Sequence, residues 1–130
     1  MARWGEIDIM ELIGSPTKER LAAGDVDPTD NARQSNKIIY GTPHFYYVDG
    51  DVDKDGSYDP YELGGNVKIS EDFYDEYHVF GIDWYPDHID WYLDGVIYNS
   101  MNLVGDARLQ AASVSINRPQ MLKLNLATGG

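Results

Sequence analysis

The residues of this chain best suited to chemistry are three carboxylates close to its amino terminus: Glu6, Asp8 and Glu11. When carboxyl groups converge, one of them can stay protonated near neutral pH while its neighbour is ionised. Cleavage of a glycosidic bond requires such a pair, and closeness on one strand favours the short separation of retaining enzymes, about 5–5.5 Å. The alternative is an amphipathic strand whose acidic face is merely solvated, which is common for exposed carboxylates.

The segment that carries these carboxylates alternates between polar and apolar residues, and we predict a β-strand over residues 4–13. In a regular strand the first two carboxylates would share one face, and Glu11 would fall on the other. A single β-bulge at Ile9 or Met10 would return Glu11 to their face. All three carboxylates would then converge.

A second acidic cluster matches the calcium-loop template, with ligand candidates Asp51, Asp53, Asp55 and Glu62 and a glycine at the sharp turn. The flanking residues lack a helical pattern, which argues against a paired EF-hand. We predict an acidic insertion over residues 49–62 that could bind a structural Ca²⁺. The alternative is a solvated hairpin loop. No cofactor is needed for the carboxylate chemistry itself.

The elements that must hold these residues are short strands separated by turn signals, which predicts an all-β, antiparallel β-sandwich. Besides the carboxylate strand, we predict strands over residues 37–40, 44–48, 76–84, 89–93, 96–98 and 120–127. Asp94-Gly95 joins two of them, and this pair favours a two-residue hairpin because both positions tolerate positive φ. Residues 15–37 are polar and rich in turn signals, so we predict a long surface loop there.

Charge and composition restrict the partners of the chain. The net charge is −12, from 22 acidic residues against 10 Lys and Arg, so nucleic acid and polyanionic substrates would be repelled. A neutral polysaccharide or a cation fits better. The 130 residues suit a single domain and contain no cysteine for a disulfide or thiolate site. No run reaches the length of a membrane span, and no signal peptide is visible.

Several segments together resemble glycoside hydrolase family 16, and they follow the family's order along the chain. The stretch from Trp4 to Glu11 is similar to the bulged active-site signature of laminarinases, agarases and carrageenases. The segment Tyr40-Gly41-Thr42-Pro43-His44 resembles the one that carries a histidine of the active-site cleft. Residues 77–84 with 89–95 are similar to the central hairpin of the family, and residues 122–130 to its strand ending in two glycines.

The resemblance implies a jelly roll of the concanavalin A type. It also implies a retaining endo-glycosidase that hydrolyses β-1,3-glucan of the laminarin type through a covalent glycosyl-enzyme intermediate. In that mechanism Glu6 would be the nucleophile, Asp8 would orient and tune it, and Glu11 would be the acid/base. Family members are secreted, so an extracellular location is expected.

Three further residues are candidates for substrate binding. His44 and Trp84 become cleft candidates through the resemblance, although a core aromatic is an equal interpretation of Trp84. Trp4, just before the signature, could form a platform on which a sugar stacks, or could cap the sheet.

The family domain contains strands that have no counterpart in residues 1–130, so we expect a partial catalytic domain and an incomplete sandwich. Exposed strand edges would favour pairing with a second copy of the chain. Besides the hydrolase, two functions stay open: a catalytically inactive carbohydrate-binding fragment, and a calcium-dependent interaction module.

Overall fold

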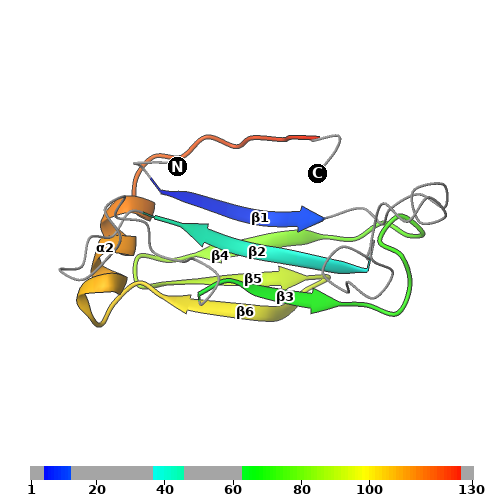
Figure 1. The fold of residues 1–130 in the computed structure, drawn as a ribbon, viewed down its shortest axis with the longest axis horizontal. Coiled ribbons are helices and arrows are strands. Elements are labelled where there is room, and N and C mark those ends of the chain that lie inside the picture. The colour runs from blue at the N-terminus through cyan, green and yellow to red at the C-terminus, as the bar shows by residue number, and fades with distance from the viewer. Residues whose placement is uncertain (1–4, 13–36, 46–62, 127–130) are drawn as a thin grey trace, which may run out of the picture.

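The computed structural model describes residues 5–12, 37–45 and 63–126, which form six strands and one helix (Figure 1). The strands are β1 (Glu6–Leu12), β2 (Ile38–His44), β3 (Gly65–Lys68), β4 (Phe80–Trp84), β5 (His88–Leu93) and β6 (Val96–Asn102), and the helix is α2 (Ala107–Ile116). In this part of the chain, no helix is both long enough and apolar enough to cross a membrane.

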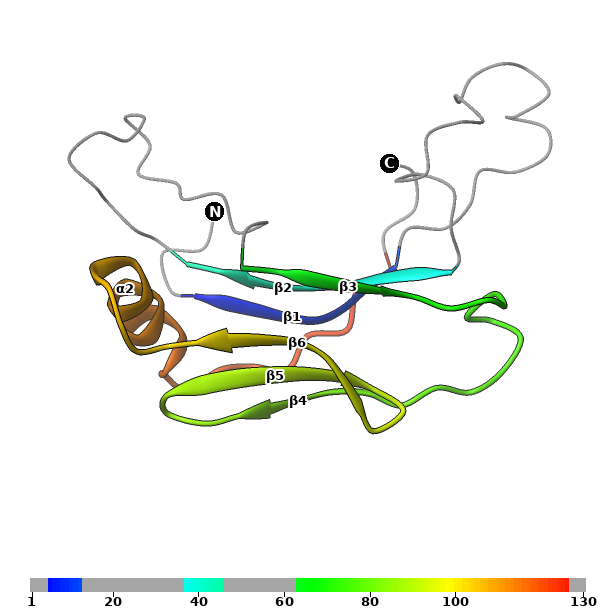
Figure 2. The same cartoon turned by 90° about the horizontal axis from the view of Figure 1, so that it is seen from below.

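The strands form two antiparallel sheets of three strands each, in the orders β1-β2-β3 and β4-β5-β6. Figure 2 shows the sheets stacked face to face, and contacts join β1 to β4 and β3 to β6. The predicted antiparallel β-sandwich is therefore confirmed. Among the described residues, no third layer covers the outer face of β1 and β2, and this face carries the carboxylates.

The core lies between the sheets and is closed at one end by α2. Its larger cluster contains Phe45, Ile89, Trp91, Met101, Leu103, Ala112 and Ile116. Trp91 is completely buried, and its ring lies against Gly41 of β2, where any Cβ atom would overlap it. Tyr98 packs at the same place, and burial raises the pKa of its hydroxyl to about 12.

The turn between β5 and β6 has the geometry that its sequence predicts. Asp94 and Gly95 adopt φ angles of 51° and 80°, which suit the tight two-residue hairpin. The Asp94 carboxylate accepts a 2.8 Å hydrogen bond from the Val79 backbone N–H and lies 2.7 Å from Nδ1 of His78. The bond to His78 lowers the pKa of the Asp94 carboxyl. This turn therefore also anchors the chain that leads into β4.

Helix α2 is an element that the sequence analysis did not predict. Asp106 caps its amino terminus, because Oδ1 accepts a 3.0 Å hydrogen bond from the Leu109 backbone N–H. Leu109, Ala112 and Ile116 then recur at helical spacing and pack on the core. The cap and this spacing are the signals that could have identified the helix.

The predicted strand over residues 120–127 is wrong for the part that the structure describes. Residues 119–126 pair with no described strand, and Figure 1 shows them running beyond the free edge of β1. The four large apolar side chains of this segment are exposed: Met121, Leu122, Leu124 and Leu126. Apolar residues of this kind stabilise a strand only where a sheet or core face can bury them, and the described elements provide none here.

Other boundaries shift because pairing decides where a strand begins and ends. The prediction over residues 37–40 lengthens to β2, because β2 pairs along its length with β1 and β3. Of the predicted strand over residues 44–48, His44 is the last residue of β2, Phe45 is not in a strand, and residues 46–48 lie outside the described residues. The prediction over residues 76–84 shortens to β4, and the one over residues 96–98 lengthens to β6. Strand β3 was not predicted, and it is only four residues long.

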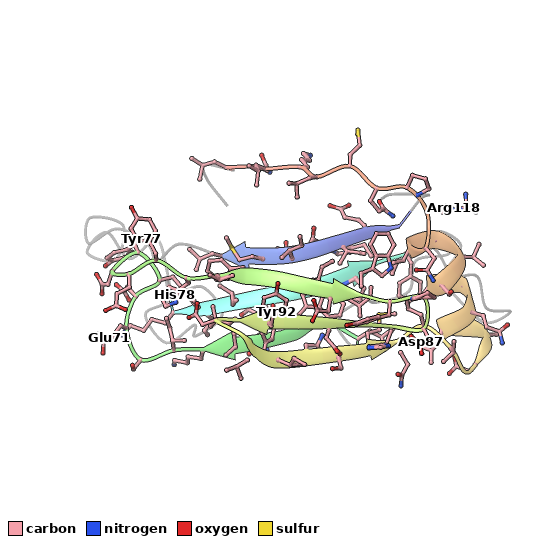
Figure 3. All side chains as sticks on the ribbon, turned by 180° about the vertical axis from the view of Figure 1, so that it is seen from behind. Glu71, Tyr77, His78, Asp87, Tyr92 and Arg118 are labelled. Carbon is pink, nitrogen blue, oxygen red and sulfur yellow. The ribbon has the colours of Figure 1, made fainter. Side chains whose placement is uncertain are left out.

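Replacement of Gly41 by alanine is expected to destabilise the fold by about 1–3 kcal/mol, the usual cost of overpacking a core. The added Cβ would collide with the buried Trp91 ring and would lie 2.6 Å from the Tyr98 hydroxyl. Gly81→Ala is the matched control, because its Cβ meets Tyr92, whose side chain lies on the outer face of β5 and can rotate away (Figure 3). Urea denaturation should show the larger loss for Gly41→Ala, and equal losses would contradict this account.

Candidate active site

A bulge in β1 sets the geometry of the site. Asp8 faces Thr42 of β2 and Glu11 faces Tyr40, so that two residues of β1 lie opposite the single residue Gly41. An extra residue reverses the alternation beyond it and turns the following side chains to the other face. Glu11 thereby joins the two earlier carboxylates on the outer face of the sheet. The bulge predicted from the sequence is confirmed.

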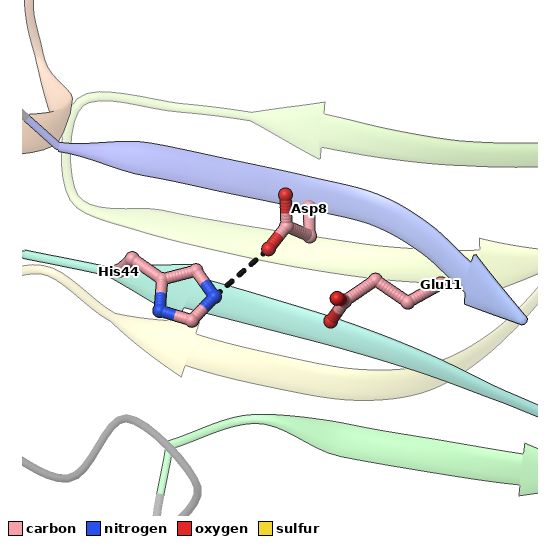
Figure 4. Close-up of side chains that lie close together, drawn as sticks. All are labelled: Asp8, Glu11 and His44. Carbon is pink, nitrogen blue, oxygen red and sulfur yellow. Dashed lines mark ion pairs between the residues drawn. The ribbon is translucent and has the colours of Figure 1, made fainter. Parts of the chain in front are cut away.

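The outer face brings Asp8, Glu11 and His44 together (Figure 4). Nε2 of His44 lies 2.8 Å from Oδ2 of Asp8, and the hydroxyl of Thr42 donates a 3.1 Å hydrogen bond to Oε2 of Glu11. One polar atom from each of the three titratable residues lies within 4.8 Å of the other two. Glu6 is exposed and stands directly opposite His44 in the strand register.

His44 is the titratable group that can bring a positive charge to this acidic face. Its hydrogen bond to Asp8 raises the pKa of the imidazole, partial burial lowers it, and the nearby charges of Asp8, Glu6 and Glu11 raise it further. The net effect is a raised pKa. A protonated His44 would reduce the repulsion among the three carboxylates.

Trp91 fixes the carboxylate strand from the opposite sheet. Its Nε1 donates a 3.0 Å hydrogen bond to the backbone carbonyl oxygen of Asp8, at the start of the bulge. The bond crosses the core from a completely buried side chain. A buried indole N–H needs an acceptor, and a bulge disrupts the local hydrogen-bond ladder of its strand. The two requirements are met by one bond.

Asp8, Glu11 and His44 are also the group in the described ranges whose ligand atoms lie close enough to share a metal ion. One imidazole and two carboxylates suit a divalent transition metal such as Zn²⁺ or Mn²⁺. The sequence analysis missed this grouping, because the histidine becomes a neighbour of the carboxylates only through the pairing of β1 with β2. Thr42 was missed for the same reason, and Trp91 was missed because it reaches Asp8 only through the packing of the two sheets.

Trp84, a predicted cleft residue, does not lie beside the carboxylates. It lies at the end of β4, in the other sheet, and its Nε1 donates a 2.8 Å hydrogen bond to Oδ1 of Asn117. The Asn117 amide donates in turn to the carbonyl of Pro86. Trp84 thus joins the β4–β5 turn to the end of α2, beside an open pocket of about 440 Å³ that it shares with Tyr85 and Arg118.

The remaining predicted site residues lie outside the described residues. These are Trp4 and the four calcium-ligand candidates, Asp51, Asp53, Asp55 and Glu62.

Comparison with known proteins extends over almost the whole chain. The family model described as "Glycosyl hydrolases family 16" matches residues 2–126. A glucan endo-1,3-beta-glucosidase of Cryptopygus antarcticus is 29% identical over 111 residues, which cover 83% of this chain and 38% of that protein. The chain therefore spans well under half the length of this curated relative.

Two solved structures are also similar. The endo-beta-1,3-glucanase from Pyrococcus furiosus is 31% identical, with a TM-score of 0.45, over 75% of this chain and 28% of that one. The laminarinase catalytic domain from Thermotoga maritima MSB8 is 26% identical, with a TM-score of 0.46, over 76% of this chain and 30% of that one.

The stability of the chain is expected to fall as the pH rises through the raised pKa of His44. A pKa raised on folding stabilises the folded state fully below the ordinary imidazole value of 6.5, and this contribution disappears above the raised value. Urea denaturation over this range should show that the stability difference between the wild type and His44→Gln shrinks with rising pH. Asp8→Asn should remove most of the same dependence. A difference that does not change with pH would refute the assignment.

Proposed function

The chain belongs to glycosyl hydrolases family 16, and on that premise we propose that its carboxylate face hydrolyses β-1,3-glucan with retention of configuration. The observation that carries the proposal is the bulge in β1, which turns Glu11 to the face of Glu6 and Asp8. An acid and a nucleophile on one strand suit the short carboxylate separation of retaining enzymes, about 5–5.5 Å.

A neutral glucan is the substrate that the charge of the chain favours. The net charge of −12 repels polyanions, whereas uncharged sugar rings are not affected by it. The β-1,3 linkage is supported by the Cryptopygus antarcticus relative, which is named for that bond. Because glucanases of family 16 are typically secreted, we extend the proposal to an extracellular enzyme.

In the first step Glu6 and Glu11 act together. The protonated carboxyl of Glu11 gives its proton to the glycosidic oxygen while the Glu6 carboxylate attacks the anomeric carbon. The bond between the anomeric carbon and the glycosidic oxygen breaks, and the shortened glucan leaves with the proton. A glycosyl ester on Glu6 is left behind.

In the second step Glu11, now ionised, acts as a base. It takes a proton from a water molecule, the water oxygen attacks the anomeric carbon, and the ester to Glu6 breaks. Both carboxyl groups return to their starting states. Asp8 lies between the two in the strand, and its bond to His44 holds it in place beside them.

We also propose that residues 49–62 bind a structural calcium ion. The support is the spacing of Asp51, Asp53, Asp55 and Glu62, which offers carboxylates at the positions of the calcium-loop template. This site would serve stability and would take no part in the chemistry.

Substitution of either glutamate should separate the two catalytic roles. Glu6→Gln is expected to abolish turnover, because an amide cannot attack the anomeric carbon. Glu11→Gln should lose activity on laminarin yet still release the phenol from an activated aryl β-glycoside, whose leaving group needs no proton. Azide should then restore turnover of Glu11→Gln and give a β-glycosyl azide. Glu71→Gln, in the loop between β3 and β4, is the matched control and should keep full activity (Figure 3).

Two results would contradict these roles. If azide rescued Glu6→Gln and gave an α-glycosyl azide, the roles assigned to the two glutamates would have to be exchanged. A folded chain that binds laminarin-derived oligosaccharides but cleaves no β-glucan would leave the inactive carbohydrate-binding fragment as the function.

Calcium binding should be visible by titration calorimetry. Heat of binding is expected for the wild type and should vanish in Asp53→Asn/Glu62→Gln, because two of the four carboxylate ligands are lost. Asp75→Asn/Glu76→Gln is the control with the same change of charge at exposed positions outside the loop. Equal heats in all three proteins would contradict the proposed calcium site.

A further inference from the structure

Thr42 is the buried polar side chain among the described residues, with only 5% of its surface exposed. It lies on β2 directly opposite Asp8, yet its hydroxyl donates to Glu11, the diagonal neighbour that the bulge brings within reach. A buried hydroxyl requires a partner, and here the partner is the carboxyl assigned as the acid/base.

The local sequence holds the Thr42 hydroxyl in a fixed place. Its β-branched side chain has restricted rotamers, and the following Pro43 confines the Thr42 backbone to extended conformations. Pro43 is itself fully buried, so it cannot shift easily. Glu11, by contrast, is an exposed side chain with several rotatable bonds, and such a side chain is mobile unless another group holds it.

We propose that Thr42 is the residue that positions the acid/base carboxyl of Glu11 for proton transfer. The inference rests on the proposed function for the role of Glu11, and on the 3.1 Å hydrogen bond for the contact. Oε2 accepts the hydrogen bond of the threonine hydroxyl, so the proposal places the catalytic proton of Glu11 on the other oxygen, Oε1. Thr42 therefore selects the oxygen that delivers the proton, and it touches no substrate.

The test compares Thr42→Val, which keeps the shape but removes the hydroxyl, with Thr42→Ser, which keeps the hydroxyl. On laminarin, Thr42→Val should reduce kcat roughly tenfold, a part of the 10²–10⁴-fold that a positioned acid/base contributes. Pre-steady-state release of phenolate from a dinitrophenyl β-glycoside should stay unchanged, because that step needs no acid. Thr42→Ser should recover most of the rate on laminarin.

Equal losses on both substrates would overturn the proposal, because a damaged fold or cleft slows every substrate. Unchanged kcat on laminarin for Thr42→Val would overturn it too. So would a Thr42→Ser variant as slow as Thr42→Val.

A second measurement does not depend on activity. In a double-mutant cycle of Thr42→Val and Glu11→Ala, the unfolding equilibrium constants should show a coupling of roughly threefold to tenfold. Additive effects would overturn the positioning contact. If the cycle showed clear coupling but the wild-type chain cleaved no glucan, the contact would stand and the proposed function would be wrong.

Discussion

The site depends on a mismatch of one residue between two neighbouring strands. Two residues of β1 lie opposite Gly41 of β2, and this places Glu11 on the face of the earlier carboxylates. The missing side chain of Gly41 admits the Trp91 ring beneath the sheet, and the indole N–H binds the Asp8 carbonyl at the start of the bulge. The bulge, the glycine and the indole thus form one arrangement, and the loss of any member would disturb the other two.

Charge is the second constraint, because three carboxylates on one face of a strongly acidic chain repel one another. His44 can reduce this repulsion, because Nε2 of its imidazole lies 2.8 Å from Oδ2 of Asp8. The Thr42 hydroxyl adds a neutral hydrogen bond to Glu11 and brings no charge of its own. The carboxyl of Glu11 therefore has an uncharged hydroxyl as its hydrogen-bond partner, whereas the carboxyl of Asp8 is paired with an imidazole that can be protonated. Both partners come from β2, so the pairing of β1 with β2 gives these two carboxyl groups different surroundings.

Features encoded within a few neighbouring residues could be predicted from the sequence. The alternation around Asp8 predicted β1, the resemblance of residues 4–11 to a bulged signature indicated the bulge, and Asp94-Gly95 predicted the hairpin, because each pattern is local. The partners of the carboxylates could not be predicted in this way, since Thr42 and Trp91 lie 31 and 83 residues from the groups they bind. The apolar spacing of residues 120–127 led to a strand prediction that the structure does not support for the described residues. Such spacing indicates which side chains favour burial, but it does not show that a neighbouring strand is present to pair with them. The calcium loop and the association of two copies stay predictions.

The separation of 83 residues between Trp91 and Asp8 has a consequence for the order of folding. Strands β4, β5 and β6 are joined by short turns and can form early, whereas the bulged strand must wait for a contact that closes most of the chain into a loop. Such distant contacts are entropically costly and slow to form. During refolding, hairpin structure would therefore return before the carboxylates reach their working geometry. Recovery of the site would mark the last stage of assembly, and a chain with most of its β-structure restored could still lack it.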